Sequence, residues 1–343
     1  PPGTGYWKAP AGSTNTPEAL KEAPYPGPPS FMSRYPTRFM VYLFFHSMIG
    51  GICLTATRTR ILLADAAMLC VAVLWGVGYP VSDALLDRIG PLWLLALRFS
   101  ATSVMLLVLF GSRLKRLDRR QFIQASGVGL VLAVTYLLHI YGLVFTTGGK
   151  QAFIVGTNVV MVPFLMALLY RKWPPWMATA AAAVTTVGLL VMAFSPNMNL
   201  NFGDGLSMVL ALLVAIQVIV VGYCARRMDP IALACVQMLV TCALLLPLAL
   251  VLEPFPTPQV LASSWKGILF LAAGPTVFAF VVQSMAQKHA PETHAAILLA
   301  MESPFGYLVS ISMGLDTWSL QFAAGGVLIL AGVFLAEWET FRK

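Results

Sequence analysis

The sequence predicts an all-α integral membrane protein with ten transmembrane helices, arranged as two inverted five-helix repeats behind an N-terminal extension. Two observations carry this prediction. The 343 residues are 58% hydrophobic and only 10% charged, with a mean hydropathy of +0.79, which lies far outside the range of soluble domains. Ten apolar stretches of about twenty residues, each long enough to cross a bilayer, fall into two sets of five.

The first sixty residues precede these stretches and differ from them. Residues 1–38 are predicted to form an extended or disordered arm, because residues 1–30 are rich in Pro, Gly, Ser and Thr and cannot bury a core. Residues 39–56 are apolar and could be an extra crossing, an interfacial helix, a signal-like segment or foreign sequence. We favour a possible extra membrane-associated helix outside the repeats.

The ten spans follow in two sets. The first repeat, residues 61–199, contains the expected spans 61–82, 91–110, 123–145, 151–170 and 176–194. The second repeat, residues 200–339, contains the expected spans 205–224, 230–252, 266–285, 293–313 and 318–336. Five crossings place the start of the second repeat on the opposite side of the membrane, so the two copies must be inverted relative to each other.

Polar residues support a duplication. A shift of 139 residues aligns Asp65 with Asp204 and Arg98 with Gln237. Later in the repeat the shift becomes 141, which aligns Pro163 with Pro304, and finally 144, which aligns Gly188 with Gly332. Small insertions in loops would produce this drift. Inverted halves with a substrate site between them are the plan of many secondary transporters.

Basic residues predict the orientation. If the first span starts in the cytoplasm, fourteen Lys and Arg residues lie inside and only Arg88, Lys150 and Lys266 lie outside. This distribution follows the positive-inside rule, with both ends of the ten-span core in the cytoplasm of a bacterial inner membrane. Because the basic residues are spread over short loops, nucleic acid is not an expected partner. The expected partners are the lipid bilayer and a small-molecule substrate.

Two charged residues within the spans are the strongest candidates for a substrate site, because a charge within the bilayer is costly and needs a reason. Glu302 lies near the middle of the ninth span. It could bind a substrate amine or cation, carry a proton, or be a structural carboxylate. Arg98 lies in the second span and could bind a substrate carboxylate. The structural alternatives, which we favour for Arg98, are an ion pair with Glu302 or Asp83 and capping of broken-helix carbonyls.

Other candidates share a position within the spans. Aromatic, imidazole and amide side chains that could line a cavity are Trp75, Tyr79, Tyr136, His139, Tyr141, Asn158, Gln217 and Gln283. For any single aromatic residue, packing or an interfacial position is the more common role. Glycines and prolines that could break or hinge the spans are Gly76, Gly78, Pro80, Pro163, Gly274, Pro275 and Pro304. Broken spans at matching positions of two halves indicate a carrier's site.

Catalytic and metal-binding patterns are missing from the sequence. The HAPETH segment lacks the HExxH spacing of zinc enzymes, and neither a GxSxG elbow nor a phosphate-binding glycine loop occurs. The five cysteines show no paired spacing and are expected to pack in the core. We therefore predict no enzyme activity, no metal site and no cofactor.

A succession of motifs runs through residues 61–338: LWG, LRF, AFIVGTNVVMVP, MESPF and LILAGVFLAE. This succession resembles the drug/metabolite transporter superfamily, EamA type. The resemblance implies a ten-helix bundle of two inverted repeats that carries small metabolites, often amino acids, commonly outward. Residues that match recurring positions of the family are Trp75, Arg98, Pro163, Glu302 and Pro304.

The chain departs from that family where members usually show a Gly-Glu pair after the fourth and ninth spans. It has Arg171-Lys172-Trp173 and Gly314-Leu315-Asp316 instead. We predict a membrane carrier of a small polar, amino-acid-like metabolite, an exporter that works by alternating access. The alternative is a transporter-derived accessory subunit that docks on a larger membrane complex through residues 1–56 and no longer transports.

Overall fold

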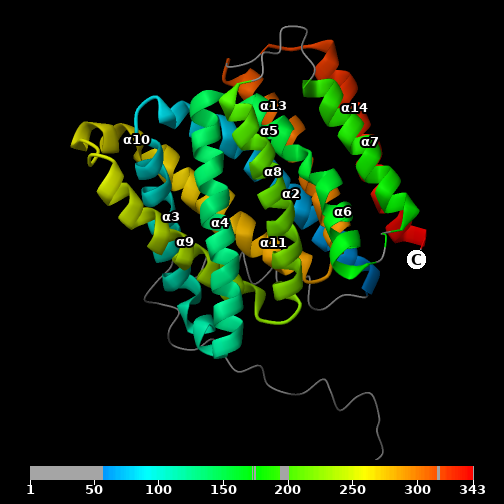
Figure 1. Cartoon of the computed structure of the whole chain (residues 1–343), viewed down its shortest axis with the longest axis horizontal. Coiled ribbons are helices and arrows are strands. Elements are labelled where there is room, and N and C mark those ends of the chain that lie inside the picture. Colours follow the sequence, from blue (N-terminus) through cyan, green and yellow to red (C-terminus); the bar gives the residue numbers. More distant parts are fainter. Residues whose placement is uncertain (1–56, 172, 174, 194–200, 315–316, 343) are drawn as a thin grey trace, which may run out of the picture. The chain divides into compact units, whose positions relative to one another are not determined.

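The computed structural model describes residues 57–171, 173, 175–193, 201–314 and 317–342, and every regular element among them is helical (Figure 1). The predicted arm, residues 1–38, and the apolar stretch 39–56 lie outside the described residues.

The helices correspond to the ten predicted spans. In the first repeat they are α2 (Thr57–Leu86), α3 (Pro91–Phe110), η1 (Gly111–Arg116), α4 (Arg119–Phe145), α5 (Gly148–Gly156), α6 (Asn158–Tyr170) and α7 (Trp176–Ala193). In the second repeat they are α8 (Phe202–Ala225), α9 (Pro230–Leu252), α10 (Pro258–Leu271), η2 (Ala272–Phe278), α11 (Ala279–Gln287), α12 (Glu292–Leu299), α13 (Glu302–Ser312) and α14 (Leu320–Arg342). Eight helical segments of the described chain are long and apolar enough to cross a membrane, and the shorter apolar stretches Trp176–Val191 and Leu320–Leu335 complete the ten.

The two repeats are inverted, as the fifth and tenth spans show directly. Gly332 of α14 lies against Ala181 and Thr185 of α7, whereas Gly188 lies against Gly325. Residue numbers rise along α7 as they fall along α14, so these helices pack antiparallel and side by side (Figure 1). Glycine at both contacts lets the two backbones approach closely. Equivalent helices of the two repeats therefore run in opposite directions.

Each repeat packs mainly on the other rather than on itself. α2 lies against α11, α12 and α13, and α8 lies against α4, α5 and α6. The second and seventh spans, α3 and α9, also pack together antiparallel, with the Ser103 Oγ donating to the Met238 carbonyl oxygen at 3.3 Å. The centre of the bundle is thus an interface between the repeats.

The fourth and ninth spans are each broken into two helices. The breaks fall at Thr157, between α5 and α6, and at Ala300–Met301, between α12 and α13. α12 begins 144 residues after α5, and α13 begins 144 residues after α6. The structural register of these spans is therefore 144 and not the 141 inferred from Pro163 and Pro304. Position, not proline, is what the two broken spans share.

The expected proline and glycine interruptions are realised unevenly. Pro304 is the third residue of α13, where its missing N–H would have had no intrahelical partner. Gly274 and Pro275 lie in η2, a π-helical segment of the eighth span. Pro163 lies inside α6.

The first span is not interrupted. α2 remains helical through Gly76, Gly78 and Pro80, so the interruption expected there is absent from this structure. Gly76 instead allows close packing, because a Cβ atom there would lie 2.5 Å from the Glu302 carbonyl oxygen and 2.7 Å from the Gly306 nitrogen. The hinge role of these residues stays a prediction.

The second span of each repeat, α3 in the first and α9 in the second, begins with a different cap. Asp229 precedes Pro230 and accepts hydrogen bonds from the backbone nitrogens of the first turn of α9. Burial would raise the pKa of the Asp229 carboxyl, but a hydrogen bond from Arg113 and these backbone bonds hold that pKa below its usual value. In the first repeat Gly90 stands before Pro91, and the Glu253 carboxylate caps α3 from the other repeat.

Candidate functional site

A cavity lies between the two repeats, where α2, α3, α4, α5, α8, η2, α11 and α13 meet. The space between protein atoms there, including the part that opens to solvent, is about 660 Å³. Eight of the predicted substrate-site residues line it: Trp75, Tyr79, Arg98, Tyr136, His139, Gln217, Gln283 and Glu302. Two predicted hinge residues, Gly78 and Pro275, also contribute to its wall.

Two predicted cavity residues lie elsewhere. Tyr141 follows His139 by two positions on α4, which turns its side chain by about 200° around the helix and away from the cavity. Asn158 is buried at the break of the fourth span, where its Nδ2 donates to the Val155 carbonyl oxygen at 2.8 Å. It supports the broken backbone instead of lining the cavity.

Arg98 is anchored by hydroxyl groups. Its Nε donates to the Thr276 Oγ1 at 2.8 Å, and its Nη2 donates to the Tyr136 hydroxyl oxygen at 3.2 Å. The guanidinium carbon also lies 4.9 Å from the centre of the Tyr136 ring, within the range of a cation–π contact. Across the described residues, no carboxylate oxygen lies within 4.0 Å of this guanidinium, so the expected ion pair of Arg98 with Glu302 or Asp83 is not formed.

Glu302 owes its position to the break in the ninth span. It is the first residue of α13, so its side chain starts at a helix N-terminus, where backbone N–H groups favour a negative charge. The residue is 3% exposed. Among the described residues no hydrogen bond and no ion pair of its carboxylate is formed, which argues against the alternative of a structural carboxylate. The cavity therefore carries one cation and one carboxylate that do not neutralise each other.

Aromatic rings form much of the remaining wall. The Trp75 Nε1 donates to the Pro275 carbonyl oxygen at 3.0 Å, and its ring centre lies 5.2 Å from that of Phe280. The Tyr79 and His139 rings meet edge to face with their centres 5.0 Å apart. These contacts fix flat apolar surfaces around the two charges.

Amides complete the wall. Gln283 is fully buried, and neither its Nε2 nor its Oε1 has a hydrogen-bond partner within the described part of the chain. The Gln217 Nε2 donates to the Gln237 Oε1 at 3.1 Å, which leaves the Gln217 Oε1 without a partner there. Buried amides are normally satisfied, so these unpartnered atoms are exceptions that lie on residues of the cavity wall.

Several residues at or next to the cavity wall were not predicted from the sequence. Leu132 and Thr135 precede Tyr136 and His139 by about one helical turn, and this spacing alone would have placed all four on one face of α4. Thr276, the partner of Arg98, could not be paired with it from sequence, because the two residues are 178 positions apart.

Comparison with known proteins agrees with this architecture. Residues 62–194 and 201–338 each match the sequence model of the EamA-like transporter family. The chain belongs to the EamA-like transporter family. The resemblance seen in the sequence is thereby confirmed, and the protein is a multi-pass membrane transporter, not an enzyme.

Individual relatives are distant. An uncharacterized transporter of Archaeoglobus fulgidus (strain ATCC 49558 / DSM 4304 / JCM 9628 / NBRC 100126 / VC-16) is 25% identical over 284 residues, which cover 82% of this chain and 88% of that protein. One solved crystal structure superposes with a TM-score of 0.67 at 17% identity, covering 81% of this chain and 98% of that chain. This likeness concerns the fold alone.

Proposed function

We propose that this transporter carries a small amino-acid-like zwitterion, and that it exports this metabolite by alternating access of the central cavity. One observation carries the proposal. Arg98 and Glu302 line the same cavity, both are buried, and neither has a partner of opposite charge among the described residues. A buried charge without a counter-ion is costly, so a site that keeps two of them is suited to a ligand that supplies both counter-charges.

The geometry of Arg98 suits a carboxylate. A guanidinium has five N–H donors in a planar fork, and the contacts with Thr276 and Tyr136 use two of them. The remaining donors can bind the two oxygens of a carboxylate. Glu302 would then accept hydrogen bonds from the ammonium group of the same substrate.

The walls suit a small substrate with an apolar or aromatic side chain. Trp75, Tyr79 and Phe280 offer ring surfaces, while Gln283 offers an amide donor and acceptor. A pocket of this kind, mostly apolar with a few convergent polar groups, is typical of small-molecule sites.

Export is proposed from the family resemblance, which implies outward transport of small metabolites, and the orientation is proposed from the loop charges. The excess of Lys and Arg, fourteen residues against three, supports a cytoplasmic position for the loops that carry Arg113, Arg226 and Lys288. The carrier would then lie in the cytoplasmic membrane of a bacterium, with both ends of the ten-helix core inside, and would release its substrate on the opposite side.

Exchange in proteoliposomes tests the proposal. Proteoliposomes that contain the purified protein are loaded with an unlabelled amino acid. Uptake of labelled amino acids is then compared with uptake of the matching amine and the matching carboxylic acid. We expect uptake of the zwitterion to exceed that of either analogue by about tenfold or more, since each analogue leaves one buried charge unpaired. Glu302→Gln should reduce exchange, whereas Asp87→Asn, which alters an exposed carboxylate, should not.

Failure would have a clear form. If well-folded protein exchanges none of these compounds, the proposed carrier function is wrong. Retention by a larger membrane assembly that depends on residues 1–56 would then favour the accessory-subunit alternative.

A further inference from the structure

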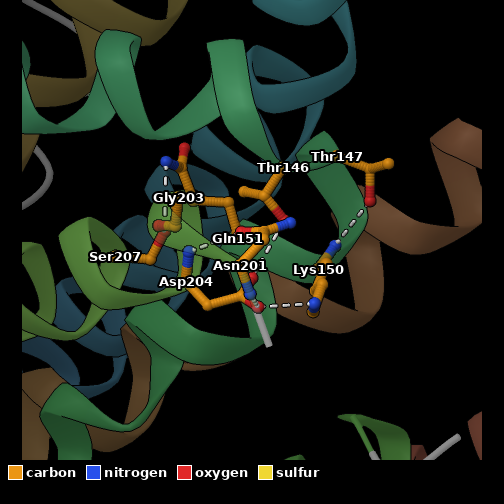
Figure 2. Close-up of polar contacts among 8 residues, drawn as sticks. All are labelled: Thr146, Thr147, Lys150, Gln151, Asn201, Gly203, Asp204 and Ser207. Atoms are coloured by element: carbon orange, nitrogen blue, oxygen red, sulfur yellow. Dashed lines mark hydrogen bonds and ion pairs between the residues drawn. The ribbon is translucent and has the colours of Figure 1, made fainter. Parts of the chain in front are cut away.

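An ion pair ties α5 to α8 at one end of the bundle (Figure 2). The Lys150 Nζ lies 2.6 Å from the Asp204 Oδ2, and the Asp204 side chain is only 4% exposed. The same carboxylate accepts a hydrogen bond from the Thr146 hydroxyl at 3.1 Å and from the Asn201 backbone nitrogen at 2.9 Å. Asp204 is thus held in place by the capping box of α8, and Lys150 of α5 is attached to a fixed group.

Gln151, the residue after Lys150, connects this region to the wall of the cavity. The Gln151 Nε2 donates to the His139 carbonyl oxygen at 2.9 Å and lies 3.4 Å from the Ser207 Oγ. Figure 2 shows Lys150 and Gln151 reaching from α5 toward the start of α8. Because His139 lines the cavity, the contact between α5 and α8 lies directly beyond the cavity wall.

A second pair occupies the equivalent place in the other repeat. The His294 Nε2 lies 2.9 Å from the Asp65 Oδ1, with both side chains less than a tenth exposed. His294 is the third residue of α12, as Lys150 is the third residue of α5. Asp65 aligns with Asp204 at the shift of 139, and Lys150 aligns with His294 at the shift of 144, the registers of their respective spans.

Both pairs join one repeat to the other, but at opposite ends of the bundle. Lys150 belongs to the first repeat and Asp204 to the second, whereas Asp65 belongs to the first and His294 to the second. Since the repeats are inverted, the first pair lies at the end that charge predicts to be outside, and the second lies at the end with the basic loops. Rocking of the two halves must separate the repeats at whichever end opens.

We propose that these pairs are the latches of the transport cycle. The outer latch, Lys150 and Asp204, must break for the cavity to open outward, and the inner latch, Asp65 and His294, must break for it to open inward. Both are formed in this structure. The four residues do not line the cavity, so they set the balance between the two open states without binding the substrate. The inference rests on the proposed carrier function.

Side-specific labelling of the cavity tests the latches without a substrate. A reporter, Val214→Cys, is placed in the cavity wall of a variant whose native cysteines are replaced. Its reaction with a membrane-impermeant maleimide is then measured from each side of oriented vesicles. Lys150→Gln removes the outer latch but leaves the capping box intact. We expect the ratio of outside to inside labelling to rise about fivefold, the size expected for one partly buried ion pair.

The inner latch provides the matched comparison. Asp65→Asn and His294→Gln should each lower the same ratio, and combining either with Lys150→Gln should return it toward the parent value. Lys150→Arg keeps the charge and should leave the ratio unchanged. The latch proposal is overturned if Lys150→Gln and Asp65→Asn leave the ratio unaltered, or move it in the same direction.

Folding and function are separated by two further measurements. Each variant must elute as the parent does in size-exclusion chromatography; if Lys150→Gln does not, the two inner-latch variants carry the test with the same criteria. Normal amino-acid exchange with unmoved labelling ratios would refute the latches but keep the carrier. Opposite shifts of the ratios without exchange of any compound would refute the proposed carrier function but keep the latches.

Discussion

Equivalent positions in the two repeats carry different chemistry on one backbone plan. The second span has Arg98 where the seventh has Gln237, and the second half-helix of the ninth span begins with Glu302 where that of the fourth begins with Asn158. Both charges therefore come from only one member of each pair, and both line the cavity. Under the proposed function, we expect the symmetric frame to supply the two-sided motion and the asymmetric side chains to supply the substrate site.

The contrast between the repeats can be tested by giving a residue the identity of its counterpart. The largest effect is expected from Arg98→Gln, which makes the second span resemble the seventh. Without the guanidinium, the substrate carboxylate would enter a buried site with no cation, at a cost of about 3 kcal/mol, or roughly a hundredfold in exchange. Initial exchange rates in proteoliposomes measure this.

The control for Arg98→Gln is Arg88→Gln, which removes an exposed arginine at the end of the first span. Exchange that survives in Arg98→Gln at a rate near that of Arg88→Gln would show that the cation plays no part in binding.

The two repeats could be predicted from the sequence for a physical reason. Span length and charge in loops are local features that a bilayer constrains, and the Asp65–Asp204 register follows from comparing two segments of the sequence directly. The structure corrected the register of the broken spans from 141 to 144, because helix breaks are set by tertiary contacts and not by Pro163 and Pro304 alone.

The residues of the candidate site were only partly predictable from the sequence. Intramembrane charged, aromatic, imidazole and amide residues identified eight of the seventeen residues that line the cavity, and the charged ones stood out because a charge is costly in lipid. The partners were not predictable: Arg98 binds Thr276 on a π-helical segment rather than a carboxylate, and α2 keeps its helix through Pro80. Both outcomes depend on neighbours that lie far away in the sequence.

The next largest effect concerns the packing of α2. Gly76 corresponds to Ala215 in the second repeat, and a methyl group at Gly76 would meet backbone atoms of Glu302 and Gly306. Since backbone cannot move aside as a flexible side chain can, Gly76→Ala should destabilise the fold by about 2 kcal/mol. Thermal unfolding in detergent measures this loss.

The reverse change, Ala215→Gly, gives the matched control. It should cost about 1 kcal/mol, the ordinary price of glycine within a helix. A smaller loss for Gly76→Ala than for Ala215→Gly would contradict the close packing of α2 on α13.

The inner latch can be given the chemistry of the outer one. A lysine keeps its charge at neutral pH, whereas the His294–Asp65 pair is an ion pair only when the imidazole is protonated. His294→Lys should therefore strengthen the inner latch and raise the outside-to-inside labelling ratio of the Val214→Cys reporter about threefold. His294→Gln lowers that ratio under the same hypothesis, so equal responses of the two variants would rule it out.

The smallest effect is expected at the helix end that departs from the family pattern. Arg171 and Gly314 end α6 and α13 with positive φ angles of 51° and 74°, and Arg171 alone among the described residues other than glycine has this conformation. The left-handed region costs a residue with a Cβ atom about 1 kcal/mol relative to glycine.

Arg171→Gly should thus raise the free energy of unfolding by up to about 1 kcal/mol, less any loss from the more flexible unfolded chain. Exchange should stay at the parent rate, because Arg171 is exposed and lies outside the cavity. A lower unfolding temperature for Arg171→Gly would show that the arginine side chain stabilises this end by more than its backbone strain costs.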